Sequence, residues 1–138
     1  MGYDSLFRCL DVSASGLKAE RARMDTVAQN IANANVTRAK DGKPYRRQEV
    51  VFETVLEKGD RAFGGVRVSR IEQDNSPYIE VMDPGHPDAD ANGVVHMPNV
   101  RMPFEMVDMI TAARAYEANL NLIKTFKQMV ERALAMGR

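Results

Sequence analysis

Apolar residues recur every seven positions along the last quarter of the chain, in a stretch from Pro103 to Met136 that has no internal proline or glycine. One line of the repeat consists of Met102, Met109, Tyr116, Ile123 and Val130. A second line, four residues further on and broken only by Lys127, consists of Met106, Ala113, Leu120 and Leu134. On a helix the two lines form one apolar face, because positions i, i+4 and i+7 lie on the same side. A strict seven-residue repeat drifts by about 20° per heptad on a straight helix, so this pattern favours left-handed supercoiling around a long partner.

A second, weaker seven-residue repeat runs through the N-terminal region from Asp4 to about Asn33. Its members are Leu10, Leu17, Met24 and Ile31, with Leu6 and Val27 beside them. Gly16 lies in the interior of this stretch, where a glycine costs about 1 kcal/mol relative to alanine. The pattern predicts a second long helix that depends on tertiary packing for its stability.

Between the two helical stretches, residues 45–100 show the alternation and the branched side chains of short β-strands. The first predicted strand runs from Val50 to Leu56 and the second ends at Ile71 after the pair Gly64-Gly65. A third begins near Pro77, and a fourth covers residues 94–97. A β module of this size has a marginal core, so we expect it to lean on the helices or on neighbouring subunits.

Composition limits the classes of function. The 138 residues carry 19 basic and 19 acidic side chains, so nothing global indicates a nucleic-acid or anionic-membrane partner. Residues 38–47 are the most basic stretch, and without stacking aromatics we interpret them as a solvated connector or an intersubunit ion-pair surface. Cys9 is the only cysteine, which excludes an internal disulfide and a multi-cysteine zinc site. The first residues lack the basic leader and apolar run of a secretory signal peptide, and no stretch predicts a membrane span.

One loop has residues that could carry chemistry. Asp83, His86, Asp88 and Asp90 could serve as metal ligands or acid–base groups. The same loop contains Pro84-Gly85, Pro87 and Asn92-Gly93, which are turn formers, and its spacing matches no known metal motif. We therefore favour a structural loop, and the sequence offers no catalytic residue.

Three segments in the right order carry a family resemblance. The run S-A-S-G-L-K-A-E-R-A-R-M-D-T-V-A-Q-N-I-A-N-A-N-V-T resembles the N-terminal signature of the bacterial flagellar rod and hook proteins, and E-M-V-D-M-I-T-A-A-R-A-Y-E-A-N-L-N-L-I-K-T resembles their C-terminal signature. The stretch D-P-G-H-P-D-A-D-A-N-G-V-V-H-M-P-N-V, followed by R-M-P-F-E-M, is similar to the one that distinguishes the short proximal rod member. The turn R-A-K-D-G-K-P-Y-R-R after Thr37 is longer than the T-x-G-Y form of many family members. The signature positions are Asn30, Asn33, Asn35, Thr37, Asp83, Pro84, His86, Pro87, Asp88, Asp90, Gly93, Pro98, Asn99, Glu105, Met106, Arg114, Tyr116 and Asn119.

This resemblance implies an α+β fold in which residues 1–35 and 102–138 pair as a coiled-coil-like inner domain around an inserted β-rich domain, residues 36–101. It implies a structural subunit of the proximal rod that polymerises with itself and other rod proteins, transmits torque and encloses the export channel. It also implies export by the flagellar type III apparatus without a cleaved signal, and a place in the basal body, where the rod crosses the periplasm near the membrane ring and peptidoglycan. No enzyme activity, cofactor, metal, nucleic acid or small-molecule substrate is expected.

The apolar faces of the two helices then form the expected assembly interface. Its residues are Leu6, Leu10, Leu17, Met24, Val27, Ile31, Met106, Met109, Ile110, Ala113, Tyr116, Leu120, Ile123, Phe126, Val130 and Leu134. Helical polymers arise from contacts that do not close into a ring, so apolar surface should remain exposed in the monomer. A cytosolic coiled-coil adaptor is the alternative function, and a metal-binding protein that uses the loop from Asp83 to Asp90 is a weaker one.

Overall fold

The computed structural model describes residues 2–56 and 63–137 of the chain, with the side chains of residues 2–6 and 63 left aside. In the sequence, one long helix precedes four strands and a second long helix follows them. The elements are α1 (Gly2–Ala32), β1 (Gln48–Leu56), β2 (Phe63–Gln73), β3 (Ile79–Met82), β4 (Val94–Met97) and α2 (Met102–Met136). The expected α+β class, both long helices and all four strands are therefore confirmed, with helix ends within two residues of those that periodicity predicts.

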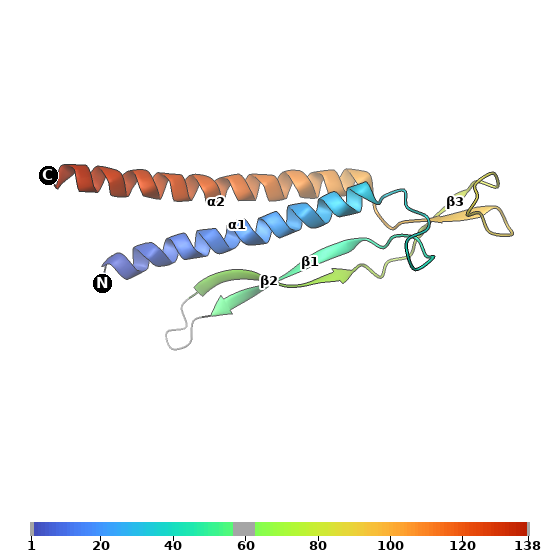
Figure 1. Cartoon of the computed structure of the whole chain (residues 1–138), viewed down its shortest axis with the longest axis horizontal. Helices are drawn as coiled ribbons and strands as arrows, with labels where there is room; N and C mark the ends of the chain where they lie inside the picture. The colour runs from blue at the N-terminus through green and yellow to red at the C-terminus, as the bar shows by residue number, and fades with distance from the viewer. Residues whose placement is uncertain (1, 57–62, 138) are drawn as a thin grey trace.

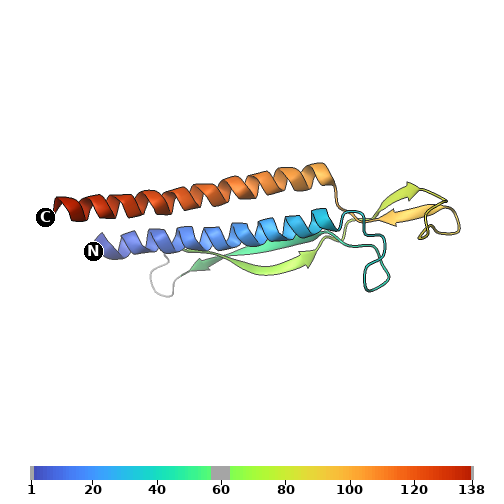
Figure 2. The same cartoon turned by 45° about the horizontal axis from the view of Figure 1, so that its top comes forward.

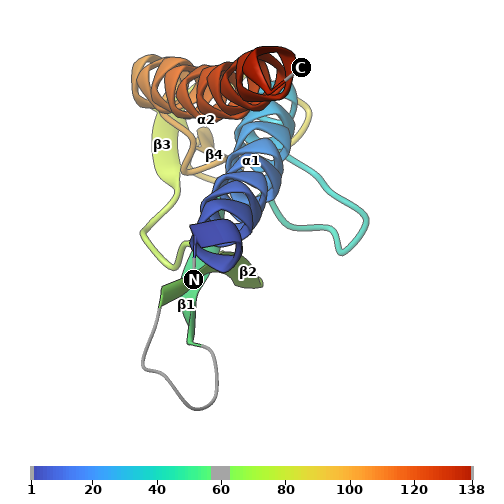
Figure 3. The ribbon, with the colours of Figure 1, turned by 90° about the vertical axis from the view of Figure 1, so that its left-hand side faces the viewer.

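Helices α1 and α2 lie side by side in antiparallel directions, so both chain ends lie at the same end of the elongated molecule (Figures 1 and 2). Their axes are inclined to each other when the molecule is viewed from that end (Figure 3). Pro103 occupies the first turn of α2, where its missing N–H costs no helical hydrogen bond, and Gly137 follows the last turn. None of the described helices has an apolar stretch long enough to cross a membrane.

The middle of the chain forms two separate antiparallel two-stranded sheets, not one compact sheet. The longer hairpin, β1–β2, runs back along α1, so that α1 lies between α2 and the hairpin (Figures 1 and 3). The short pair β3–β4 projects beyond the other end of the helices (Figure 1). The expectation that the β residues need support from the helices thus holds for β1–β2. The proposed domain boundaries remain predictions.

A close approach between α1 and β2 fixes the hairpin on the helix. The Ser15 hydroxyl donates to the Val12 carbonyl at 2.6 Å and accepts from the Val66 N–H at 3.1 Å. Gly65, at φ +114°, lies directly against this serine, and a Cβ at position 65 would stand 2.4 Å from Ser15 Oγ. The glycine is therefore required both by its backbone conformation and by the lack of space.

The apolar core is thin. Among the described residues, the buried apolar side chains are Ala19, Val27, Val95, Pro98, Val100 and Ala112, all of them small. Many larger apolar side chains are exposed, including Phe7, Phe104 and Leu134. A two-helix layer cannot cover both of its faces, so this subunit alone leaves much of its apolar surface in water.

Replacing Gly65 by alanine should destabilise the docked hairpin more than the same change at Gly42. Both glycines have positive φ, which costs an alanine about 1–2 kcal/mol, but position 42 has open space around it and position 65 meets Ser15. Urea unfolding of the two purified variants measures the difference in free energy. Equal losses at the two positions would contradict the docking of β2 on Ser15.

Candidate assembly interface and its polar hub

A buried carboxylate lies where the two helices meet. Glu105, in the first turn of α2, is 1 % exposed. It accepts a hydrogen bond from Asn30 Nδ2 of α1 at 3.1 Å and one from Arg47 Nε at 2.5 Å. A buried charge is tolerated only when it is paired and hydrogen-bonded, and both conditions are met here. Its place at a helix N-terminus also favours a negative charge.

Asn30 joins the end of α1 to the start of β1. Its side chain is fully buried and pairs with the main chain of Gln48 in both directions, donating to the carbonyl and accepting from the N–H at 2.9 Å each. Its Oδ1 also accepts from the Tyr45 hydroxyl at 2.9 Å. One amide thus satisfies two main-chain groups, a phenol and a carboxylate, which no residue without both a donor and an acceptor could do.

Asn99, in the connection between β4 and α2, joins that connection to the start of β1 and to the connection between β2 and β3. Its Oδ1 accepts from the main-chain N–H of Arg47 at 2.8 Å. Its Nδ2 donates to the Asp74 carbonyl at 3.0 Å and to Ser76 Oγ at 2.9 Å. We call the set Asn30, Tyr45, Arg47, Gln48, Asn99 and Glu105 the polar hub. The hub binds together α1, β1, the β2–β3 connection, the β4–α2 connection and α2.

The electrostatics of the hub follow from burial and charge pairing. Burial opposes the charge of Arg47, but hydrogen bonds to Glu105 and Glu49 outweigh it and raise the pKa of the guanidinium above its ordinary range. Burial, and then the charge of Glu105, raise the pKa of the Tyr45 phenol. Asp74, 3.6 Å from Arg47, has a lowered pKa, chiefly because the main-chain N–H of Ser76 donates to it. Every charge in the hub has a counter-charge, which is the arrangement of a structural junction.

The basic stretch behaves differently from the prediction at two positions. Arg47 belongs to the hub, and Arg46 lies over the Tyr78 ring at 4.5 Å while donating to the carbonyls of Asp74 and Ser76 at 3.1 Å. These arginines hold the chain's own segments together and are not solvated connector residues. Periodicity could not show this, because the Asp74 carbonyl that Arg46 binds and the Glu105 carboxylate that Arg47 binds lie 28 and 58 residues away in the sequence.

The loop between β3 and β4 is built from turns. Asp83 accepts from the Gly85 N–H, and Asp90 accepts from the N–H groups of Asn92 and Val94, which lower the pKa of the Asp90 carboxyl. His86 Nδ1 accepts from the Asp88 N–H at 3.0 Å.

Two further contacts pack the loop. Asp88 accepts from the Thr37 hydroxyl at 2.8 Å and lies 3.6 Å from Arg38 Nε, which fastens the loop to the turn after α1. Gly93 has φ +77°, and its Cβ position would stand 2.9 Å from Pro84 Cγ. In the described part of the chain, no three His, Cys, Asp or Glu side chains gather in a way that could hold a metal ion.

The expected interface residues divide into two classes. Most are half-buried or buried: Leu10, Leu17, Met24, Val27, Ile31, Met109, Ala113, Tyr116, Leu120, Ile123 and Phe126. Met106, Ile110, Val130 and Leu134 are exposed, and the side chain of Leu6 lies outside the described residues. Whether neighbouring subunits cover any of them stays a prediction.

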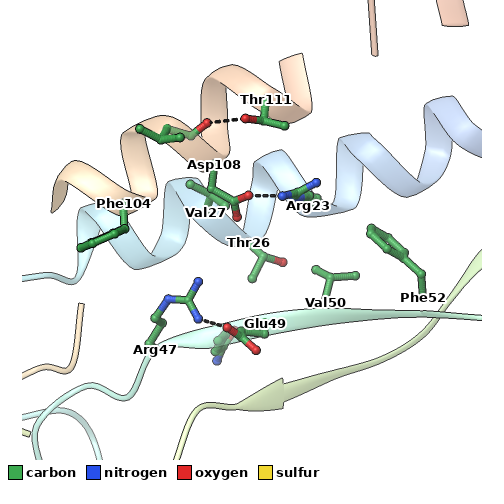
Figure 4. A pocket seen from close by; sticks show the side chains of 12 residues that line it. Arg23, Thr26, Val27, Arg47, Glu49, Val50, Phe52, Phe104, Asp108 and Thr111 are labelled. Atoms are coloured by element: carbon green, nitrogen blue, oxygen red, sulfur yellow. Dashed lines mark hydrogen bonds and ion pairs between the residues drawn. The ribbon is translucent and has the colours of Figure 1, made fainter. Parts of the chain in front are cut away.

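The two fully buried residues of α2, Glu105 and Ala112, each lie one position before a member of the predicted second line, Met106 and Ala113. Ala113 and Leu120 of that line are themselves half-buried. Further along, Asn119 packs over Gly16, where a Cβ would stand 2.9 Å from Asn119 Nδ2. Arg23 of α1 forms an ion pair with Asp108 (Figure 4). Polar contacts, which a search for apolar residues ignores, therefore set the register of the two helices.

Several signature residues are explained by these contacts. Asn30, Asn99 and Glu105 form the hub, Thr37 and Asp88 bond to each other, and Asn119 covers Gly16. Asn33 donates to the Gln29 carbonyl at 2.7 Å at the end of α1, and Pro98 is buried. Arg114 and Asn35 are exposed, and no contact among the residues that the structure describes explains them.

Known proteins resemble this chain over nearly its whole length. Residues 10–40 match the family described as flagella basal body rod protein, and residues 91–136 match the C-terminal family of flagellar basal body rod FlgEFG proteins. The flagellar basal-body rod protein FlgC of Borreliella burgdorferi is 44% identical, with 95% of this chain and 97% of the relative covered. The FlgC proteins of Yersinia enterocolitica and Bacillus subtilis are 41% and 40% identical, with 97% and 96% of this chain and 99% and 98% of the relatives covered.

This chain belongs to the FlgC family of flagellar basal-body rod proteins. The resemblance seen in the sequence is thereby confirmed, and with it the role of a structural subunit of the basal-body rod. Membership of the FlgC family also implies assembly with other flagellar rod proteins. Its relatives are structural rod proteins and not enzymes.

Replacing Arg47 by alanine should lower the free energy of unfolding by about 3–5 kcal/mol, because the carboxylate of Glu105 would stay buried without its cation. The matched control is Arg67→Ala, which breaks the exposed ion pair with Glu53 and should have no measurable effect. Chemical unfolding followed by circular dichroism measures both. A loss for the Arg47 variant as small as that of the control would show that the hub does not stabilise the fold.

Stability should fall as the pH rises above about 10, because the folded state holds the Tyr45 proton more tightly than the unfolded state does. The contribution of this raised pKa is complete below the ordinary value of 10.0 and is lost as the pH rises through the folded value. An absorbance titration of the folded protein should show a late-ionising tyrosine that disappears in Tyr45→Phe. Absence of this late step in the parent protein would contradict the prediction.

Proposed function

We propose that this subunit polymerises through α1 and α2 into the proximal part of the rod, where the two helices pair in a coiled-coil-like inner layer around the export channel. The observation that carries the proposal is an apolar groove between the helices near the chain ends. This groove has a volume of about 750 Å³ and is lined by Phe7, Leu10, Ile123, Phe126, Val130 and Leu134, among others. Covering one such side chain contributes about 1.5–3 kcal/mol, so neighbouring subunits gain stability by filling it.

The shape of the surface favours an open polymer over a closed dimer. The groove lies at the end of the molecule with the two termini, whereas exposed Phe104 and Met106 lie at the beginning of α2, near the hub. Different apolar surfaces at opposite ends favour head-to-tail contacts, which extend when the rotation does not close.

Transmission of torque requires that each subunit turn as one body. The polar hub supports this role, because it fastens both helices and both connecting segments to the same buried ion pair. A structural subunit of this kind needs no catalytic residue, cofactor or metal, and we propose none. The turn chemistry of the loop at residues 83–93 supports a structural loop over the alternative of a metal site.

Membership of the family supports the remaining parts of the proposal. The subunit leaves the cell through the flagellar type III apparatus without a cleaved signal, and it takes its place where the rod crosses the periplasm, near the membrane ring and the peptidoglycan. A cytosolic coiled-coil adaptor remains the competing function. It would work without export and without β1–β2.

Replacing Leu134 by aspartate should abolish rod assembly without unfolding the subunit, because this side chain is 69% exposed in the monomer yet lines the apolar groove. The matched control is Gln128→Asp, a change of the same charge at an exposed polar position of the same helix. Swimming and recovery of basal bodies are measured in a strain that lacks its own copy. Normal swimming of the Leu134 variant would remove the groove from the polymer interface.

A further inference from the structure

The loop between β3 and β4 contains Asn92-Gly93, the only asparagine–glycine pair in the sequence. Asparagine is a thermolabile residue, and a following glycine favours its breakdown because no Cβ shields the glycine nitrogen. In this reaction the Gly93 nitrogen loses its proton and attacks Cγ of Asn92. The new C–N bond closes a cyclic imide, and the Cγ–Nδ2 bond breaks so that ammonia leaves with a proton taken from water. Water then opens the imide to aspartate or isoaspartate.

Hydrogen bonds to Asp90 hold the attacking nitrogen in place. The Gly93 N–H donates to the Asp90 carbonyl at 3.0 Å. One oxygen of the Asp90 carboxylate accepts from the N–H groups of Asn92 and Val94, at 2.8 Å and 2.9 Å. To close the imide, the Gly93 nitrogen must give up its proton and turn toward the Asn92 side chain. The reaction therefore has to break the bonds that Asp90 makes on both sides of the pair.

Packing also fixes Gly93 although Asn92 itself is exposed. Gly93 is buried, and its Cβ position would stand 2.9 Å from Pro84 Cγ. Its carbonyl accepts from the Asp83 N–H at 2.9 Å. Water thus reaches the Asn92 side chain, while the main chain that must move lies against the opposite side of the loop.

A second turn in the same chain has the same main-chain bonds without this support. The Gly42 N–H donates to the Ala39 carbonyl at 2.9 Å, and the Ala39 N–H donates to the Lys43 carbonyl at 2.7 Å. The Asp90 N–H makes the equivalent bond to Val94 at 2.9 Å, and both glycines have φ +77°. Position 39 has no carboxylate, however, and a Cβ at Gly42 would meet nothing within 4 Å.

We infer that Asn92 is a latent deamidation site, which Asp90 protects by holding the turn and Pro84 by packing on Gly93. Isoaspartate would add one CH₂ group to the main chain between positions 92 and 93. The next residue, Val94, is the first of β4 and pairs with Met82 of β3. The modification would therefore disturb the register of this sheet where it begins. The inference does not depend on how the subunit polymerises.

The first test compares the folded protein with the same protein in guanidinium chloride, in one mildly alkaline buffer. Loss of ammonia followed by hydrolysis raises the mass by nearly one dalton, and peptide mapping assigns the change to position 92. We expect the reaction in the folded protein to be on the order of a hundredfold slower, the factor that three ordinary hydrogen bonds provide. Equal rates in the two states would overturn the inference.

The second test removes the protecting carboxylate. Asp90→Ala should speed deamidation of the folded protein by about tenfold, whereas Asp90→Asn keeps an acceptor oxygen and should stay near the rate of the parent. The matched control is Asp83→Ala, which removes a carboxylate of the same loop that accepts from the Gly85 N–H and should leave the rate unchanged. A rate for Asp90→Ala equal to that of the parent would show that Asp90 does not protect Asn92.

The third test leaves the loop between β3 and β4 untouched, so it holds even where Asp90→Ala loosens that loop as a whole. Asp41→Asn places the same dipeptide in the turn that ends at Gly42, which lacks the carboxylate and the packing. Within this one folded variant, position 41 should lose ammonia at least about tenfold faster than position 92. Equal rates at the two positions would overturn the inference, because the two turns share their main-chain bonds and differ in the support around them.

Discussion

The structure depends on one buried ion pair, that between Glu105 of α2 and Arg47 at the start of β1. Removing a carboxylate from water costs several kcal/mol, and this cost is offset only where a cation and further donors are held in place. Asn30 supplies a further donor from α1 and at the same time holds the main chain of Gln48. The carboxylate therefore forces segments that are far apart in the sequence to meet at one point, and the long helices and hairpin extend from that point.

This polar anchor fixes how the segments meet in a fold whose apolar core is thin. The buried apolar side chains of the described residues are small, and larger ones remain exposed along α2. Polar contacts determine how the helices meet, at Arg23–Asp108 and at Gly16–Asn119, and leave apolar surface free. For a rod subunit this division is useful, because directional bonds define the shape of one copy while non-directional apolar contacts remain for its neighbours.

The periodicity of apolar residues was sufficient to locate the helices and strands along the sequence. The seven-residue repeats located both helices, and runs of branched residues located all four strands. The resemblance to flagellar rod proteins also marked Asn30, Asn99 and Glu105, though it gave them no physical role. The apolar count did not indicate that Glu105 and Asn119 of α2 contact α1, because both of these residues are polar.

The sequence by itself determined two long terminal helices, four intervening strands and membership of a family of rod proteins, since local periodicity and three signature segments carry that information. Only the tertiary structure decided that the strands form two separate sheets, that β2 rests on Ser15 through Gly65, and that Glu105 is buried against Arg47. Glu105 and Arg47 lie 58 positions apart. The pairing of a buried charge over such a separation depends on the whole path of the chain, and no local pattern records it.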